Sequence, residues 1–388
     1  MKKRAFYIIL LFILILPAKS WSQWPIIKTD ADSLIQLGAD YIYNVEFNKA
    51  RDCFNEVIKR YPDHPAGYFL DAMIEWWKIL LYRDTYEFDG PFLDKIEKVI
   101  KVSDKLLAAN EFDIKGLFFK GGALGFRGRF WALRKSWIRA ASDGNEAFNI
   151  LIECWKTAPS NHDIMLGTGI YNYFAEAIPE KYPYLKPLLT FLPPGDKEIG
   201  IKQLKACSRH ALYAGVEAEV VLLQIYYTFE RDNRKAMEMA EYLNKKYPRN
   251  PYFQRYLGRT YVINGYLDDW ERVWRKILNS YIAGERGYDV LSAREALYYI
   301  GMALMRKADY NMALKYFNKC EEASRVLDDE DDPSGFRVQA NLYIGKIFDK
   351  LGKRDRAKEQ YEKILDWDDY NGSHKQAERY LNKAYGKH

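Results

Sequence analysis

The sequence lacks the residue patterns that carry catalytic or metal chemistry. Its 388 residues include only five histidines and four cysteines, and these do not stand at the spacing of a zinc site or of a catalytic motif. The glycine-rich stretch at 121–125 follows no predicted strand, so it does not indicate a nucleotide-binding loop. No nucleophile, general base and oxyanion-binding group occur together. We therefore expect a protein that is not an enzyme and that binds no metal ion or cofactor.

An excess of charge of one sign is also lacking. The chain has 59 basic and 53 acidic residues, which gives a formal net charge of +6. Residues 1–20 contain four basic residues and no acidic residue, so the rest of the chain carries only +2. Binding to a phosphate backbone needs a concentration of positive charge. The sequence therefore predicts no nucleic-acid partner.

The apolar run at the N-terminus is short for a membrane-spanning helix. Ala5 to Leu16 provide about a dozen residues, whereas a span needs roughly 20. The run follows three basic residues and ends before Ala18 and Ser20, which fit the exit of a signal peptide. We predict a signal peptide over residues 1–20 and an exported protein, periplasmic or secreted, with no stable membrane span after cleavage. The alternative is an uncleaved signal that anchors the protein in the membrane.

What the sequence does contain is a recurring pattern of about 34 residues. In residues 31–64 a Leu-Gly pair stands at places 7 and 8, Tyr41 at place 11, Ala50 at place 20, Phe54 at place 24 and a proline at place 32. Small residues let two antiparallel helices approach closely, large ones fill the space between them, and proline ends the second helix. Place 8 recurs at positions 38, 72, 122, 167, 224, 258, 301 and 345, with insertions in five of the steps.

This pattern resembles the tetratricopeptide repeat (TPR), a helix-turn-helix unit. The resemblance implies an all-α fold, a right-handed TPR α-solenoid of about eight helix-turn-helix repeats. Residues 21–388 would then form a single domain, and the segment from Ser373 to Tyr385 would be a C-terminal capping helix. Cys154, Cys207 and Cys320 share one small position of the repeat, so we expect the cysteines to be buried core residues rather than disulfides.

The family geometry implies that places 2, 5, 9, 12 and 13 of each first helix line a concave groove. In the first five repeats these places are mainly aromatic and apolar, and in the last three they are more polar and partly basic. We predict a non-catalytic scaffold that buries a protein or peptide segment in this groove. The predicted binding residues are Tyr43, Phe69, Trp76, Trp77, Phe126, Arg127, Tyr171 and Asn172. The alternative is a secreted carbohydrate-binding or carbohydrate-processing protein, whose groove aromatics stack on sugars.

The longest insertion, at 177–196, is rich in proline and apolar residues. It either packs back onto its own groove and neighbouring helices or serves as a free interaction arm; we favour packing, because solvated loops are rarely so apolar. Residues 165–205 also resemble TPR proteins related to the yeast inclusion-clearance family, with Gly167, Gly169, Gly195, Asp196 and Gly200 at the matching positions. That resemblance supports a structural insertion more than a shared activity.

One further segment, at 125–141, interleaves basic and aromatic residues. This composition is compatible with docking on an anionic partner or a phospholipid surface. An amphipathic helix that packs its aromatic residues inward explains the same pattern, and we favour it because the charge of residues 21–388 is nearly balanced.

Overall fold

The computed structural model describes residues 29–159, 161–190, 192–329 and 332–386, and the predicted signal peptide lies outside them. These residues form helices, turns and loops, with no strand among them. Their contacts group them in two compact units. Unit 1 contains the described residues up to Ser33, Tyr61–Ala66 and Glu97–Ala218, and unit 2 contains Leu34–Arg60, Gly67–Ile96 and the residues from Glu219 onward. The single domain over residues 21–388 stays a prediction.

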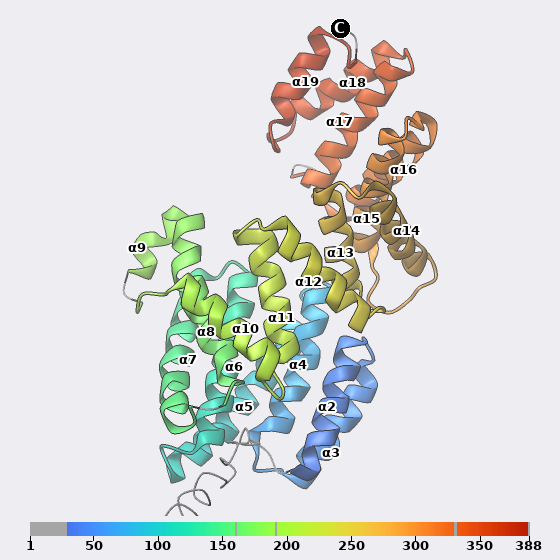
Figure 1. Cartoon of the computed structure of the whole chain (residues 1–388). Helices are drawn as coiled ribbons and strands as arrows, with labels where there is room; N and C mark the ends of the chain where they lie inside the picture. Colours follow the sequence, from blue (N-terminus) through green and yellow to red (C-terminus); the bar gives the residue numbers. More distant parts are fainter. Residues whose placement is uncertain (1–28, 160, 191, 330–331, 387–388) are drawn as a thin grey trace, which may run out of the picture. The chain divides into compact units, whose positions relative to one another are not determined.

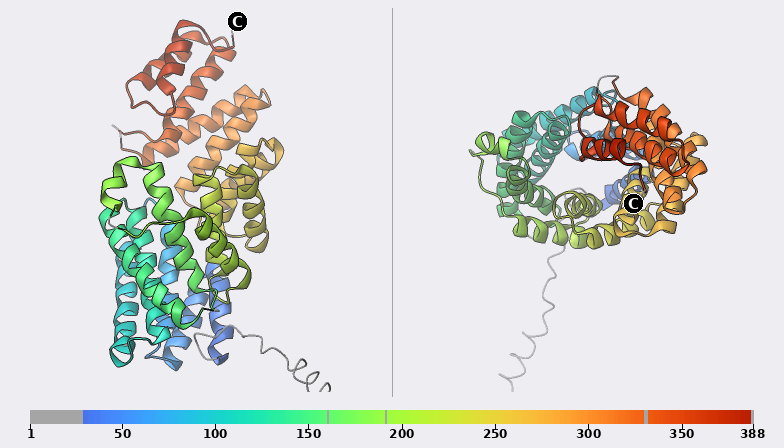
Figure 2. Two further views of the ribbon diagram at one scale, coloured as in Figure 1. Left: turned by 60° about the vertical axis from the view of Figure 1, so that its left-hand side comes forward. Right: turned by 90° about the horizontal axis from the view of Figure 1, so that it is seen from above.

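The described residues form eight antiparallel helix pairs, as the repeat pattern predicts (Figure 1). The pairs are α2 (Thr29–Tyr43) with α3 (Phe47–Arg60), α4 (Pro65–Leu81) with α5 (Asp89–Ala109), α6 (Ile114–Leu133) with α7 (Trp137–Thr157), α8 (Ile164–Lys181) with α10 (Lys197–His210), α11 (Gly215–Gln224) and the π-helical turn η2 (Ile225–Phe229) with α12 (Asn233–Lys246), α13 (Pro251–Asn264) with α14 (Leu267–Ile282), α15 (Val290–Arg306) with α16 (Tyr310–Leu327), and α17 (Gly335–Lys350) with α18 (Arg354–Leu365). Within each unit consecutive helices lie side by side (Figure 2). The all-α prediction is confirmed.

Four of the pairs are held by contact between a glycine of the first helix and an aromatic ring of the second. A Cβ atom added to Gly258, Gly301 or Gly345 would lie 3.0 Å or less from the ring of the residue sixteen places later, which is Trp274, Phe317 and Tyr361 respectively. In the first repeat the same contact joins Gly38, at place 8, to Phe54, at place 24. A side chain at any of these four glycines would push the two helices apart, because protein interiors are close-packed. The repeat signature is therefore a packing rule.

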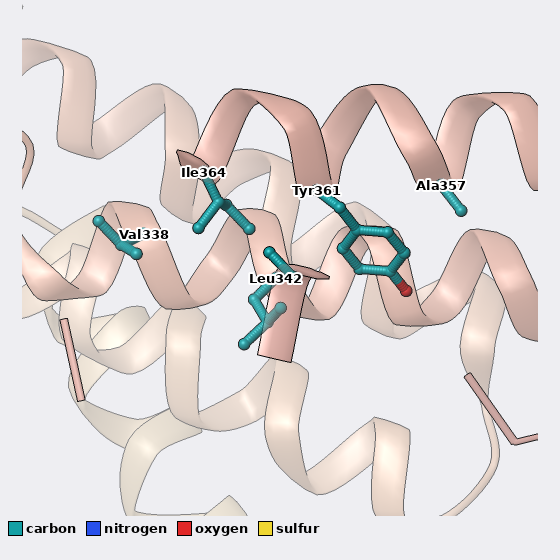
Figure 3. Packing of buried hydrophobic residues seen from close by; sticks show 6 residues of the cluster. Val338, Leu342, Ala357, Tyr361 and Ile364 are labelled. Atoms are coloured by element: carbon teal, nitrogen blue, oxygen red, sulfur yellow. The ribbon is translucent and has the colours of Figure 1, made fainter. Parts of the chain in front are cut away.

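The last pair is closed by the short helix α19 (Ser373–Asn382). Val338 and Leu342 of α17 pack with Tyr361 and Ile364 of α18 (Figure 3), and Ala377 of α19 belongs to the same buried cluster. This arrangement confirms the predicted capping helix, which covers an apolar face that a ninth repeat would otherwise bury.

Side-chain caps explain where several helices begin. Asp196, Asp232, Asp289 and Asp309 each accept a hydrogen bond from the backbone N–H of the third residue that follows. Such caps satisfy donors that the first helical turn leaves unpaired. His64, in an inter-repeat turn, has the same kind of local role, because its Nδ1 accepts the N–H of Ala66 at 3.2 Å.

The four cysteines are buried and free, as predicted. Burial raises the pKa of Cys154 to about 12, and burial is also the main reason why the pKa of Cys320 is raised to about 12. A thiol reacts as the thiolate, so these groups are poor nucleophiles. Among the described helices, none combines the length and the apolar character that crossing a bilayer requires.

Candidate functional site

The predicted aromatic groove in unit 2 is filled by the chain itself. Trp76 and Trp77 are only 2% and 1% exposed. The Trp77 ring lies 5.2 Å from that of Tyr43, 5.7 Å from Tyr252 and 5.6 Å from Phe253. Tyr43, Trp76 and Trp77 therefore belong to a core, and the prediction that they line an open groove is wrong. The physical reason is that α13 supplies the apolar surface that we assigned to a partner.

Hydrogen bonds fasten the same contact between the first repeats and the sixth. The side-chain amide of Asn250 donates to the backbone oxygen of Tyr43 at 2.9 Å, and the hydroxyl of Tyr247 donates to Asp40 at 3.1 Å. The backbone N–H of Gly287 donates to the hydroxyl of Tyr82 at 2.8 Å. Sequence reasoning missed these covering residues. The only available signal was the aromatic content of residues 247–256. Aromatic residues are expected there whether the segment packs on a neighbouring repeat or on a distant one, so the sequence does not distinguish the two.

The predicted residues of unit 1 are likewise engaged by their own unit. Arg127 donates to both carboxylate oxygens of Asp143, at 2.7 and 2.8 Å. The hydroxyl of Tyr171 donates to the backbone oxygen of Pro193 at 2.9 Å, and its ring stacks on Phe148 at 3.9 Å. Two further members of the predicted set also lie in unit 1: Phe126, which is buried, and Asn172, which donates to Gln203 at 2.9 Å.

The predicted set thus divides between the two units. Tyr43, Phe69, Trp76 and Trp77 lie in unit 2, and the other four lie in unit 1. Phe69 is half-buried, so its side chain reaches the surface only in part. A partner-binding role for Phe69, Arg127 and Asn172 stays a prediction.

The insertion packs back onto its own unit. Its short helices η1 (Pro183–Leu185) and α9 (Lys186–Leu189) contact α8, and Leu185 is buried. At its far end, Glu176 accepts the backbone N–H of Lys197 at 2.8 Å. A Cβ atom at Gly195 would lie 2.9 Å from that of Ala175, so only glycine allows this close approach. Packing onto neighbouring helices, the outcome we favoured, is what the described residues of this segment show.

A buried carboxylate in unit 2 joins three helices. Glu75 of α4 accepts hydrogen bonds from Arg51 of α3 at 2.6 Å, Lys78 at 3.0 Å and Lys95 of α5 at 2.9 Å. Burial alone would raise the pKa of this carboxyl, but these three cations outweigh it and lower the pKa to about 2. A glycosidase needs one carboxylic acid that stays protonated. Glu75 stays ionised, so this cluster does not favour the carbohydrate-processing alternative.

Two of the polar groove places in the last repeats are also covered. Arg259 forms two hydrogen bonds with the buried carboxylate of Glu295. Lys346 lies under the rings of Tyr343, Tyr380 and Tyr385, with its Nζ 4.8, 5.4 and 5.7 Å from their centroids. The C-terminal segment thus covers the eighth repeat as α13 covers the first two.

The possible metal ligands are dispersed in the part of the chain that the structure describes. No cluster of histidine, cysteine and acidic side chains there is suited to hold a metal ion. An open hollow beside α14 is lined mainly by charged side chains, but Glu271 pairs there with Arg275 at 2.7 Å and with Lys307 at 2.9 Å. The carboxylate of Glu271 is thus engaged by two cations.

Comparisons with known proteins agree with the repeat pattern. Family models described as tetratricopeptide repeat match residues 32–64, 295–326 and 338–371. No curated protein matches the chain significantly in sequence. Similar solved structures include a monomeric IFIT1 mutant with Gppp-AAAA, at 10% identity and a TM-score of 0.33. Another is a monomeric IFIT1 mutant with m7Gppp-AAAA, at 10% identity and a TM-score of 0.34. Each match covers 88% of this chain and 62% of the other, so the chain spans less than two thirds of these proteins.

The burial of Trp77 gives a first testable prediction. Trp77→Ala removes a ring that packs against three others, so we expect the free energy of unfolding to fall by about 3–5 kcal/mol. Urea unfolding followed by circular dichroism measures this change. Tyr86→Ala is the control, because Tyr86 is 73% exposed and its loss is expected to change stability by less than about 0.5 kcal/mol. Equal stability of the two variants would show that Trp77 is not a core residue.

The Glu75 cluster gives a prediction on pH. The pKa of Glu75 is lowered in the folded state from its usual 4.5 to about 2, so its contribution to stability is present above pH 4.5 and is lost as the pH falls toward 2. Glu75→Gln should therefore lower the free energy of unfolding by about 2–3 kcal/mol at neutral pH. The deficit should shrink steadily as urea titrations are repeated at lower pH. Glu362→Gln serves as control, because Glu362 is exposed, and a deficit that does not depend on pH would contradict the assignment.

Proposed function

We propose that the chain, which contains tetratricopeptide repeats at residues 32–64, 295–326 and 338–371, is a non-catalytic scaffold of the cell envelope that binds a protein segment along its last three repeats. The repeats themselves support a protein-interaction role. We further propose that the binding surface lies in unit 2 and that the protein is exported.

One observation supports the choice of surface. Place 13 of repeats 6, 7 and 8 is occupied by Ile263, Arg306 and Lys350, and all three are exposed. The row lies at the ends of α13, α15 and α17, which are consecutive first helices. In the first two repeats, by contrast, the corresponding face is buried against α13. At place 13 the last three repeats therefore keep exposed side chains, although Lys346 of the eighth repeat is covered, whereas Tyr43 and Trp77 at the same place of the first two repeats are buried.

The chemistry of this surface indicates the partner. Met302 and Met305 of α15 are half-buried beside the row, and methionine side chains adapt to differently shaped apolar groups. Arg306 and Lys350 add positive charge at the exposed ends of their helices. An apolar peptide or helix with acidic residues at its edge fits this combination, because the methionines contribute apolar area and the cations select orientation.

The proposal predicts which substitutions weaken binding. Met302→Ser combined with Met305→Ser should lower the affinity for a purified partner about tenfold or more, since apolar anchors dominate such interfaces. Partners are first captured from envelope extract on the immobilised wild-type chain, then purified and measured by calorimetry. Met312→Ser is a matched control on the second helix α16, where the side chain is 37% exposed. Unchanged affinity of a folded double variant would refute the proposed surface.

Export has its own test. If residues 1–20 are a signal peptide, the protein recovered from cells should begin near Trp21, because the peptidase cleaves after small residues. N-terminal sequencing and intact mass measure this directly. Retention of the whole N-terminus together with membrane association would instead support the uncleaved anchor.

A further inference from the structure

The basic and aromatic segment at 125–141 is not used by the proposed function, and the structure places its second half beside the insertion. The ring of Trp137, at the start of α7, lies 5.9 Å from that of Tyr182, and Tyr182 lies 6.1 Å from Tyr184. This row of rings joins the α6–α7 turn to the insertion within unit 1. The α9 helix of the insertion follows the end of α8 (Figure 1).

Around these rings lies a surface that we call the basic aromatic patch. It consists of Lys135 from the α6–α7 turn, Ile138 and Arg139 from the first turn of α7, and Lys181, Tyr184 and Lys186 from the end of α8 and the insertion. All six residues are exposed, and Ile138 and Tyr184 are each 70% exposed. Such large apolar side chains project from the surface rather than line a hollow. The aromatic residues Phe126 and Phe130 of the segment pack inward, as the sequence predicts, whereas the aliphatic Ile138 is exposed.

The charge of the patch is of one sign. Residues 129–142 and 181–190 contain no acidic residue at all. The acidic residues that border these segments are already paired: Asp143 with Arg127, and Glu180 with Lys197. The net charge of residues 21–388 is small, so this local excess of positive charge is a feature of the patch and not of the whole surface.

We propose that the basic aromatic patch docks on the surface of an anionic phospholipid membrane. Lysine and arginine near a bilayer are attracted to anionic headgroups, while tyrosine and tryptophan prefer the level of the headgroups. Ile138 and Tyr184 provide the apolar contact that enters the boundary with the acyl chains. The combination of projecting apolar tips with a rim of cations fits an extended, uniformly charged surface. This docking is independent of the peptide-binding surface proposed in unit 2.

Vesicle sedimentation tests the proposal with the full chain. We expect the protein to sediment with phosphatidylcholine vesicles that contain phosphatidylglycerol and to remain in solution with phosphatidylcholine alone. Added salt should release it. Lys135→Gln combined with Lys186→Gln should lower the partition coefficient about thirtyfold, because each basic side chain near an anionic membrane strengthens binding about fivefold. Ile138→Ser with Tyr184→Ser should lower it about tenfold.

Matched controls separate the patch from the rest of the molecule. Lys202→Gln with Lys319→Gln removes the same charge from exposed sites in other helices, and Ile282→Ser with Val326→Ser removes two side chains that are 72% and 75% exposed. These controls should bind the anionic vesicles as the wild type does. The N-terminal apolar run is the same in every variant, so binding through it would not respond to the substitutions. Equal sedimentation of patch and control variants would overturn the proposal. So would salt-sensitive binding to polyglutamate without binding to vesicles, which would assign the patch to an acidic protein.

Discussion

The close contact between a small residue of one helix and an aromatic ring of its partner is the constraint on which the structure depends. At Gly258, Gly301 and Gly345 the missing side chain allows the ring of the second helix to lie against the backbone of the first. This sets the distance between the two helices, and the distance in turn sets how the next pair packs. Because the contact recurs, each pair presents its first helix in a similar way. The proposed peptide-binding surface consists of side chains from such regularly spaced first helices.

In this chain many side chains of the first helices are covered by other parts of the chain and are not open to a partner. Trp77 packs on Tyr252 and Phe253, Tyr171 is held by the insertion, and Lys346 lies under rings from the C-terminal segment. Aromatic side chains exposed in a row would favour aggregation, and covering them removes that hazard. The internal contacts also restrict where a partner can bind. In unit 2 the surface that remains has methionine and basic residues, which suit an adaptable and oriented contact better than a rigid aromatic clamp would.

The sequence predicts what local contacts determine. A glycine and a ring sixteen residues apart meet within one helix pair, so the pairs, their number and the buried cysteines were all predictable from spacing. The helix caps were predictable for the same reason, as Asp196 shows. Contacts between distant repeats were not predictable. Whether Trp77 faces solvent or Phe253 depends on how repeats 2 and 6 pack, and three repeats separate these two in the sequence, so no pattern within a single repeat records it. The contact between Trp137 and Tyr182 of the insertion likewise joins two repeats, and no pattern within one repeat predicts it.

The bond between Asn250 and Tyr43 spans 207 residues, and this separation has a consequence for how the chain is made. Most repeat proteins can fold progressively from one end, because each repeat needs only its neighbour. Here the first two repeats stay incomplete until the sixth has been synthesised, so Tyr43 and Trp77 are exposed throughout that interval. Pairing across so long a loop is slow, and exposed apolar surface invites aggregation in the meantime. The aromatic surface of a nascent chain of this kind is covered only when its sixth repeat arrives.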